Sequence, residues 1–342
     1  MSYCASCLRK LRKADGDFCP ACRQELFDGA SVSKYLALAS PAQATMAEVE
    51  NFQRLTRQIS ISGVQEKFSL ARSADEPGRL ELVVRGGTYL LKPVPSANFG
   101  AIQHVPANEH FTMQLARQVF GLPTAACAFV HMADSSPAYL TRRFDVRPDG
   151  LRLAQEDFAQ LSQRTEQEYG PNYKYDSSYE EIGRLLKKYL PTHYLPEATL
   201  FFRLTLFNYL VANGDAHLKN FSLHRRPATG EYHLTPAYDL LNTSLHVQDG
   251  NGLALDLFAD DYETASFAAN GFLAFDDFLE LGIRLGLPPS RVRRLLADIT
   301  GHEAAIQKLL DKSFLAPELR ARYADTLASR RQRLRYSLAG AA

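Results

Sequence analysis

The sequence predicts an α+β fold of two lobes, preceded by a small cysteine module. Short strand-like runs and one amphipathic helix occupy residues 59–158, whereas helical patterns dominate residues 159–342. Such segregation of strands and helices favours an α+β fold over an alternating βαβ sheet. Residues 1–27 contain four cysteines in two close pairs, and the polar, alanine-rich residues 28–58 are predicted to form a helical linker. A chain of 342 residues is long enough for two lobes with a sizeable core.

Composition and charge exclude several classes of protein. Hydrophobic residues make up 46% and charged residues 23%, as in soluble globular proteins. The net charge of +1 gives no general attraction to nucleic acid or to an anionic membrane, so neither is an expected partner. The N-terminus lacks the apolar core of a signal peptide, and the most apolar stretch, 198–212, is interrupted by Arg203 and Asn208. With few cysteines for its length, the chain is expected to be cytoplasmic.

Strands and helices can be placed from hydrophobic periodicity. In the first lobe we expect strands at 68–71, 80–84, 88–91, 128–131 and 138–141 and a helix over 108–120. Gly86-Gly87 is expected to make a tight turn between the second and third strands, because both central positions of such a turn favour positive φ. In the second lobe we expect helices over 179–189, 198–211 and 317–338, and a hairpin formed by 221–224 and 231–235.

The most informative segment directly follows the apolar helix and reads Asn213-Gly-Asp-Ala-His-Leu-Lys-Asn220. Asp215 and Asn220 have the Asp-x4-Asn spacing of a kinase catalytic loop, where the Asp accepts the proton of the attacking hydroxyl and the Asn binds Mg²⁺. The predicted hairpin then leads to Asp239, which should return close to Asn220. A carboxylate there can bind the hard cation that bridges ATP phosphates.

The first lobe offers complementary groups. Lys92 ends a predicted strand and can reach the phosphates, and Glu109, in the first turn of the next helix, can pair with it. A Ser/Gly loop, Ser60-Ile-Ser-Gly-Val-Gln-Glu-Lys67, can cover the phosphates with its backbone N–H groups. The order of these parts is the order that a kinase fold requires.

Each residue also has an ordinary structural interpretation. Asp239 can cap a helix, Lys92 can be a solvated strand end, and the serines at 60 and 62 can be turn residues. His217 is expected to orient its loop rather than to perform chemistry.

Together these motifs resemble the HipA family of toxin kinases, from about residue 60 to about residue 242. The resemblance rests on the segments 62–67, 90–93, 108–111, 139–145, 155–158, 213–220 and 234–239. It implies a two-lobed protein-kinase-like fold of the HipA and phosphatidylinositol-kinase type. It also implies Asp215 as the catalytic residue, Asn220 and Asp239 as Mg²⁺ ligands, and autophosphorylation at Ser60 or Ser62. The implied ATP-binding residues are Ser60, Ser62, Gly63, Val64, Gln65, Lys67, Lys92, Glu109, Glu156, Phe158, His217 and Lys219, with Glu156 and Phe158 on the adenine hinge.

The paired serines and the short length resemble the HipT branch of this family. HipT-type toxins act with HipB-like and HipS-like antitoxin proteins. The family implies an aminoacyl-tRNA synthetase as substrate, tryptophanyl for HipT and glutamyl for HipA.

The cysteine module has the spacing of a metal site. Cys4-x2-Cys7 and Cys19-x2-Cys22 can form a closed tetrahedral Zn²⁺ site with a structural role; iron, a disulfide pair or a vestigial site are the alternatives. Four basic residues lie between the pairs, Arg9, Lys10, Arg12 and Lys13. Zinc knuckles also bind nucleic acid, but a solvated basic loop is the favoured interpretation.

The sequence therefore predicts an ATP- and Mg²⁺-dependent protein serine/threonine kinase that acts as a toxin. One alternative is a weakly active kinase-fold binding protein that recognises nucleic acid or a partner through its zinc module. Another is a metal-dependent hydrolase that uses Asp215, His217 and Asp239, although it gives no role to Lys92 and Glu109.

Overall fold

The computed structural model describes residues 2–40, 66–96, 100–147, 149–227, 229–247, 252–338 and 340. The chain divides into two compact units. Unit 1 comprises Met1–Leu115, Thr124–Arg152 and Lys308–Pro317. Unit 2 comprises Ala116–Pro123, Leu153–Gln307 and Glu318–Ala342.

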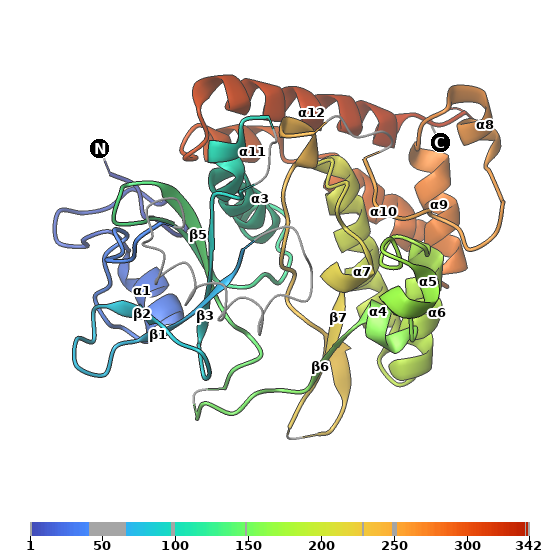
Figure 1. The fold of residues 1–342 in the computed structure, drawn as a ribbon. Coiled ribbons are helices and arrows are strands. Elements are labelled where there is room, and N and C mark those ends of the chain that lie inside the picture. The colour runs from blue at the N-terminus through green and yellow to red at the C-terminus, as the bar shows by residue number, and fades with distance from the viewer. Residues whose placement is uncertain are drawn as a thin grey trace. The chain divides into compact units, whose positions relative to one another are not determined.

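Unit 1 is built on a five-stranded antiparallel sheet with the order β2-β1-β3-β5-β4 (Figure 1). All five predicted strands are found, with small shifts of their ends. Their bounds are β1 Phe68–Arg72, β2 Leu80–Leu82, β3 Tyr89–Pro93, β4 Cys127–His131 and β5 Pro137–Arg142. Helix α3, Val105–Gln118, follows a short 3₁₀ turn, Ile102–His104, and starts three residues before the predicted position.

The expected tight hairpin turn at Gly86-Gly87 is wrong. Strands β2 and β3 are not neighbours, because each pairs with β1. Only Gly86 has a positive φ, of 74°. Gly87 is required for a different reason: a Cβ atom there would lie 1.9 Å from Oγ of Ser69 on β1. Gly86 thus supplies a positive φ and Gly87 permits close packing against β1, and the two do not form a two-residue hairpin turn.

The cysteine module shares a core with the sheet of unit 1. Helix α1, Pro20–Phe27, buries Leu26 and Phe27 in one hydrophobic cluster with Leu70 of β1 and Leu91 of β3. The hydroxyl of Tyr89 donates to the carbonyl of Leu26 at 2.9 Å. Of the predicted helical linker, residues 28–40 contain no helix, and residues 41–58 lie outside the described part of the chain.

Unit 2 combines a three-stranded sheet, in the order β6-β7-β8, with most of the helices (Figure 1). The strands are β6 Gln155–Asp157, β7 Ser222–Arg225 and β8 Tyr232–Leu234, and the antiparallel β7–β8 pairing confirms the predicted hairpin. Three predicted helices are found as α6 Tyr179–Tyr189, α7 Tyr194–Leu210 and α12 Pro317–Arg335. The others are α4 Phe158–Leu161, α5 Glu166–Tyr169, α8 Ala265–Asn270, α9 Phe275–Arg284, α10 Pro289–Ile299 and α11 Glu303–Leu310, with 3₁₀ turns at Leu218–Asn220 and Thr243–Leu245.

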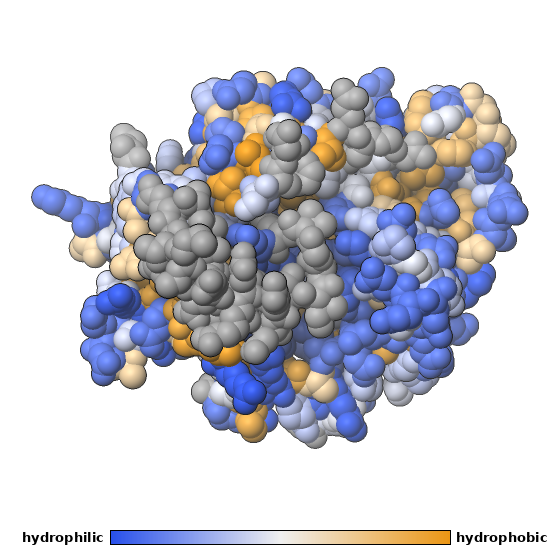
Figure 2. Space-filling model, viewed as in Figure 1, coloured by the Kyte–Doolittle hydropathy of each residue, from blue (hydrophilic) through white to orange (hydrophobic). Residues whose placement is uncertain are grey.

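Helix α7 is the buried element of unit 2. Its side chains from Phe201 to Leu210 are buried with the exception of Arg203. Hydrophilic residues predominate on the coloured surface in Figure 2. Within the described residues, none of the helices combines the length and the apolar character needed to cross a membrane.

Candidate functional site

The loop at residues 213–220 is held at the C-terminal end of α7 by hydrogen bonds to the side chains of buried Asn208 and half-buried Thr243. Asn213 donates to the side chain of Asn208 at 3.0 Å, and its backbone N–H donates to the Asn208 carbonyl at 2.8 Å. Ala212 takes a positive φ of 51°, which turns the chain sharply out of the helix. The hydroxyl of Thr243 donates to the Ala212 carbonyl and accepts from the Gly214 N–H, both at 2.9 Å. The polar interruption of α7 at Asn208 is thus an anchor for this loop.

Asp215 lies on this loop with its carboxylate half-exposed. The hydroxyl of Tyr175 donates to its Oδ1 at 2.5 Å. His217 places Nε2 3.7 Å from the same oxygen, and burial lowers the pKa of His217, so that its ring is neutral near pH 7. Burial raises the pKa of Tyr175, so its hydroxyl stays protonated and acts as a donor. Oδ1 of Asp215 is therefore oriented by a neutral hydroxyl donor.

The segment that carries Asp239 returns to the loop as the sequence predicts. The hydroxyl of Tyr238 donates to the Lys219 carbonyl at 2.9 Å, next to Asn220. Asp239 has a positive φ of 55°, a left-handed conformation that aspartate adopts more readily than most residues other than glycine. The side chain of Asn220 accepts the His217 N–H at 3.2 Å and closes the turn. A carboxylate and an amide oxygen brought toward one loop are suitable ligands for Mg²⁺.

Two of the predicted ATP-binding residues in unit 2 are tied to strand β6. Lys219 forms an ion pair with Asp157 at 2.8 Å, and Glu156 accepts from the hydroxyl of Tyr232 at 3.3 Å. Phe158 is fully buried at the start of α4. Its N–H donates to the Phe221 carbonyl at 3.1 Å, and its carbonyl accepts from Ser162. Both backbone groups of Phe158 are thus engaged within unit 2.

In unit 1, Lys92 and Glu109 form the predicted pair. The ammonium group of Lys92 lies 2.5 Å from Oε1 of Glu109, and the two side chains are only 4% and 3% exposed. The ring of Tyr139 lies under the ammonium at 5.4 Å. Breaking such a buried pair leaves an uncompensated charge, which is strongly destabilising. The pair therefore fixes the Lys92 ammonium at the end of β3.

The remaining predicted loop residues, Ser60, Ser62, Gly63, Val64 and Gln65, lie outside the described part of the chain. Lys67 directly precedes β1.

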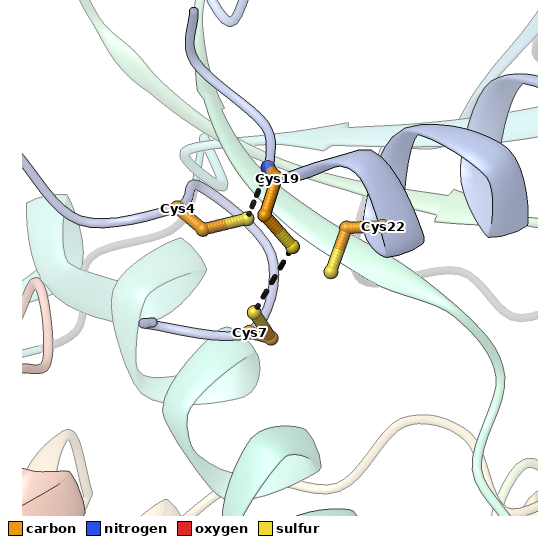
Figure 3. A group of neighbouring side chains, drawn as sticks. All are labelled: Cys4, Cys7, Cys19 and Cys22. Carbon is orange, nitrogen blue, oxygen red and sulfur yellow. Dashed lines mark hydrogen bonds between the residues drawn. The ribbon is translucent and has the colours of Figure 1, made fainter. Parts of the chain in front are cut away.

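The four cysteines of the module come together, with their sulfur atoms pointing toward one another (Figure 3). All four Sγ atoms lie within 4.8 Å of one another, and Cys7 and Cys19 are 3.7 Å apart. None of these four cysteines is joined in a disulfide. The Cys19 N–H donates to the sulfur of Cys4 at 3.3 Å. Four such sulfurs fit a tetrahedral zinc site.

The hydrolase alternative requires Asp215, His217 and Asp239 to act as one metal-binding group. Among the described residues, two groups of three or more His, Cys, Asp or Glu side chains bring their ligand atoms within 4.8 Å of one another, and this set is neither of them.

Sequence reasoning missed Tyr175, Asp157 and Thr243. Each contacts the loop from a segment at least 20 residues away, and no fixed spacing connects it to the loop motif. The one available signal was the tyrosine-rich composition of residues 169–179.

Comparisons with known proteins identify relatives of this chain. The family model described as HipA-like C-terminal domain matches residues 59–306, which confirms the predicted family resemblance. "Putative kinase Y4dM" of Sinorhizobium fredii is 33% identical over 217 residues, which are 58% of this chain and 48% of the relative. The serine/threonine-protein kinase toxin HipA of Shewanella oneidensis is 28% identical over 245 residues, 65% of this chain and 52% of the relative. The chain thus spans about half the length of these two relatives.

Solved structures also include a relative. In the complex of Shewanella oneidensis HipA with HipB and operator DNA, the matching chain has a TM-score of 0.58 and 25% identity, covering 81% of this chain and 65% of that one. This likeness confirms a mixed fold of the HipA type.

The Lys92–Glu109 pair generates a stability prediction. Glu109→Leu alone should lower the free energy of unfolding by about 3–5 kcal/mol, because it removes the buried carboxylate that pairs with the Lys92 ammonium. The double variant Lys92→Met/Glu109→Leu should recover most of this loss, since an apolar pair avoids the desolvation of two charges. Urea unfolding followed by circular dichroism measures both values. Equal stability of the two variants would contradict the burial of the pair.

Proposed function

The chain belongs to the HipA-like C-terminal domain family, and on that premise we propose that it is an ATP- and Mg²⁺-dependent protein serine/threonine kinase. The observation that carries the proposal is the loop at the end of α7. It holds both Asp215 and Asn220, and the segment with Asp239 is hydrogen-bonded to the same loop. The named relative with serine/threonine kinase activity supports the choice of acceptor.

Each group has a distinct role in the proposed reaction. Asp215 orients the hydroxyl of the acceptor serine or threonine and accepts its proton as the oxygen attacks the γ-phosphate. Tyr175 occupies Oδ1 of Asp215 and leaves Oδ2 for the acceptor hydroxyl. Asn220 and Asp239 would hold Mg²⁺, which neutralises charge on the ATP phosphates. Lys92, fixed by Glu109, would bind the α- and β-phosphates, and the loop at 60–67 would cover them.

The biological context is proposed from the same family. We propose that the kinase is the toxin of a toxin–antitoxin system and that a HipB-like protein is its partner, as HipB is for the Shewanella oneidensis HipA. The proposed substrate is an aminoacyl-tRNA synthetase, with the tryptophanyl enzyme favoured and the glutamyl enzyme next. The paired serines at 60 and 62 favour the HipT branch and a HipS-like second partner.

The first activity prediction concerns the catalytic pair of carboxylates. Asp215→Asn should lower phosphate transfer on the order of 10²-fold or more with ATP binding intact, because an amide cannot accept the hydroxyl proton. Asp239→Asn should instead weaken Mg²⁺-dependent ATP binding. Radiolabelled ATP measures transfer and calorimetry measures binding. Asp260→Asn, at a comparably exposed carboxylate of unit 2, is the control. Normal transfer by both test variants would refute the assignment.

Tyr175 gives a second prediction, on the geometry of Asp215. Tyr175→Phe removes the hydrogen bond to Oδ1 and frees the carboxylate to rotate, so kcat should fall about tenfold with the KM for ATP unchanged. Tyr189→Phe is the matched control, because the Tyr189 hydroxyl bonds to the Leu161 carbonyl. A rise in kcat would show instead that the Tyr175 hydroxyl competes with the acceptor.

A third prediction concerns autophosphorylation. A phosphate on Ser60 or Ser62 adds a charge of roughly −1.5 to −2 to the loop proposed to cover ATP, and it would repel the nucleotide. Mass spectrometry should find this phosphate in the wild type and not in Asp215→Asn. Replacing both serines with Asp should lower activity and nucleotide affinity. Full activity of the double Asp variant would remove the autoinhibition but not the kinase assignment.

We also propose that Cys4, Cys7, Cys19 and Cys22 bind one structural Zn²⁺. The ion would join the two cysteine pairs that fold against the sheet of unit 1. Cys19→Ser should lose the tightly held zinc and lower the unfolding temperature. Cys127→Ser, at a buried thiol of β4 outside the cluster, should keep the metal. Elemental analysis of protein purified under reducing conditions measures the zinc bound per chain. Wild-type protein without metal would contradict the proposal.

A further inference from the structure

Two histidines and a glutamate meet where the start of α7 lies beside the turn end of the β7–β8 hairpin. His193 immediately precedes α7, Glu231 immediately precedes β8, and His233 lies within β8. One ligand atom from each lies within 4.8 Å of the other two. Nε2 of His193 is 3.0 Å from Oε1 of Glu231, and the two imidazole rings lie side by side with centroids 5.5 Å apart. All three residues belong to unit 2.

His233 is oriented as a metal-bound histidine is. Its Nδ1 is 2.8 Å from Oε1 of Glu197, in the first turn of α7. The other oxygen of Glu197 accepts the Leu234 N–H at 3.2 Å, so the carboxylate is itself fixed. Nε2 of His233 is then left buried, with no hydrogen-bond partner among the described residues. A carboxylate that holds one ring nitrogen and leaves the other to the metal is the usual support of a histidine ligand.

From this arrangement we propose a second metal site, formed by His193, Glu231 and His233, for a divalent transition-metal ion of the zinc class. Two imidazoles and one carboxylate suit such an ion rather than Mg²⁺ or Ca²⁺, which prefer oxygen ligands. The ligand atoms lie within 4.8 Å of one another, close enough for small side-chain movements to bring all three to metal–ligand bonds of about 2.0–2.1 Å. His193 and Glu231 are 40% and 42% exposed and can move, whereas His233 is held at 12% exposure. The exposed side leaves the fourth position to water.

The position of the site gives it a structural consequence. Helix α7 leads into the loop with Asp215, and the β7–β8 hairpin lies between Asn220 and Asp239 in the chain. An ion bound by His193 and His233 would tie the beginning of α7 to the hairpin. It would thereby hold together the helix that precedes the Asp215 loop and the hairpin that connects Asn220 to Asp239. The metal site itself does not depend on the proposed kinase activity.

Metal titration of the full-length protein tests the site. The protein is first treated with a chelator, so that it keeps only tightly held metal such as the proposed cysteine-bound zinc. Zinc is then added and its binding is measured by calorimetry, and a parallel titration uses Co²⁺ as a spectroscopic probe. We expect one further equivalent, whose Co²⁺ spectrum lacks the thiolate charge-transfer bands of a cysteine site. His193→Ala, at a half-exposed position, should abolish this equivalent with folding intact. Glu197→Gln should weaken it by about 10- to 100-fold, because it disturbs the orientation of His233.

His302→Ala is the matched control. His302 is also 40% exposed and pairs with a carboxylate, Asp298, at 3.1 Å, but it belongs to neither group of candidate metal ligands. It should leave the titration unchanged. If the wild type binds no zinc beyond the cysteine site, the proposal is wrong. Equal binding by the wild type and a folded His193→Ala variant would overturn it as well.

Discussion

The candidate site depends on one constraint, the fixed exit of the chain from the buried helix α7. The helix is packed on nearly all sides over its second half, so its C-terminal end cannot shift without opening the core of unit 2. Hydrogen bonds that join the side chains of Asn208 and Thr243 to residues 212–214 then fix the start of the loop on this rigid helix end. A carboxylate on such a loop needs little reorganisation when a substrate binds, which is how positioning lowers a reaction barrier.

In unit 1 the corresponding constraint is that Lys92 is buried and needs a partner of opposite charge. Lys92 is nearly inaccessible, and a buried ammonium is tolerated only with a close opposite charge. Glu109 provides that charge from α3. The cysteine module packs with Tyr89 and Leu91 of the strand that carries Lys92, and so contributes to the stability of the sheet. Its effect on function would act through the stability of unit 1 rather than through contact with a reactant.

The sequence predicted those parts of the fold and of the candidate site that depend on residues at fixed, short spacings along the chain. The Asp-x4-Asn motif, the β7–β8 hairpin and the Lys92–Glu109 pair follow from local patterns, and the structure has all three. The pairing of β2 and β3 was wrong, because a glycine pair signals a turn but not which strands become neighbours. Tyr175 and the group of His193, Glu231 and His233 could not be predicted. Their partners lie about 40 residues apart and meet only through tertiary folding.

In the proposed kinase, Asp215, Asn220 and Asp239 form the phosphoryl-transfer centre. The most direct test is phosphoamino-acid analysis after the purified wild-type protein is incubated with radiolabelled ATP and candidate synthetases, with and without Mg²⁺. We expect Mg²⁺-dependent label on serine or threonine, either in the protein itself or in a synthetase. Release of free phosphate with no labelled hydroxyl amino acid, or labelling that does not depend on a divalent cation, would contradict it.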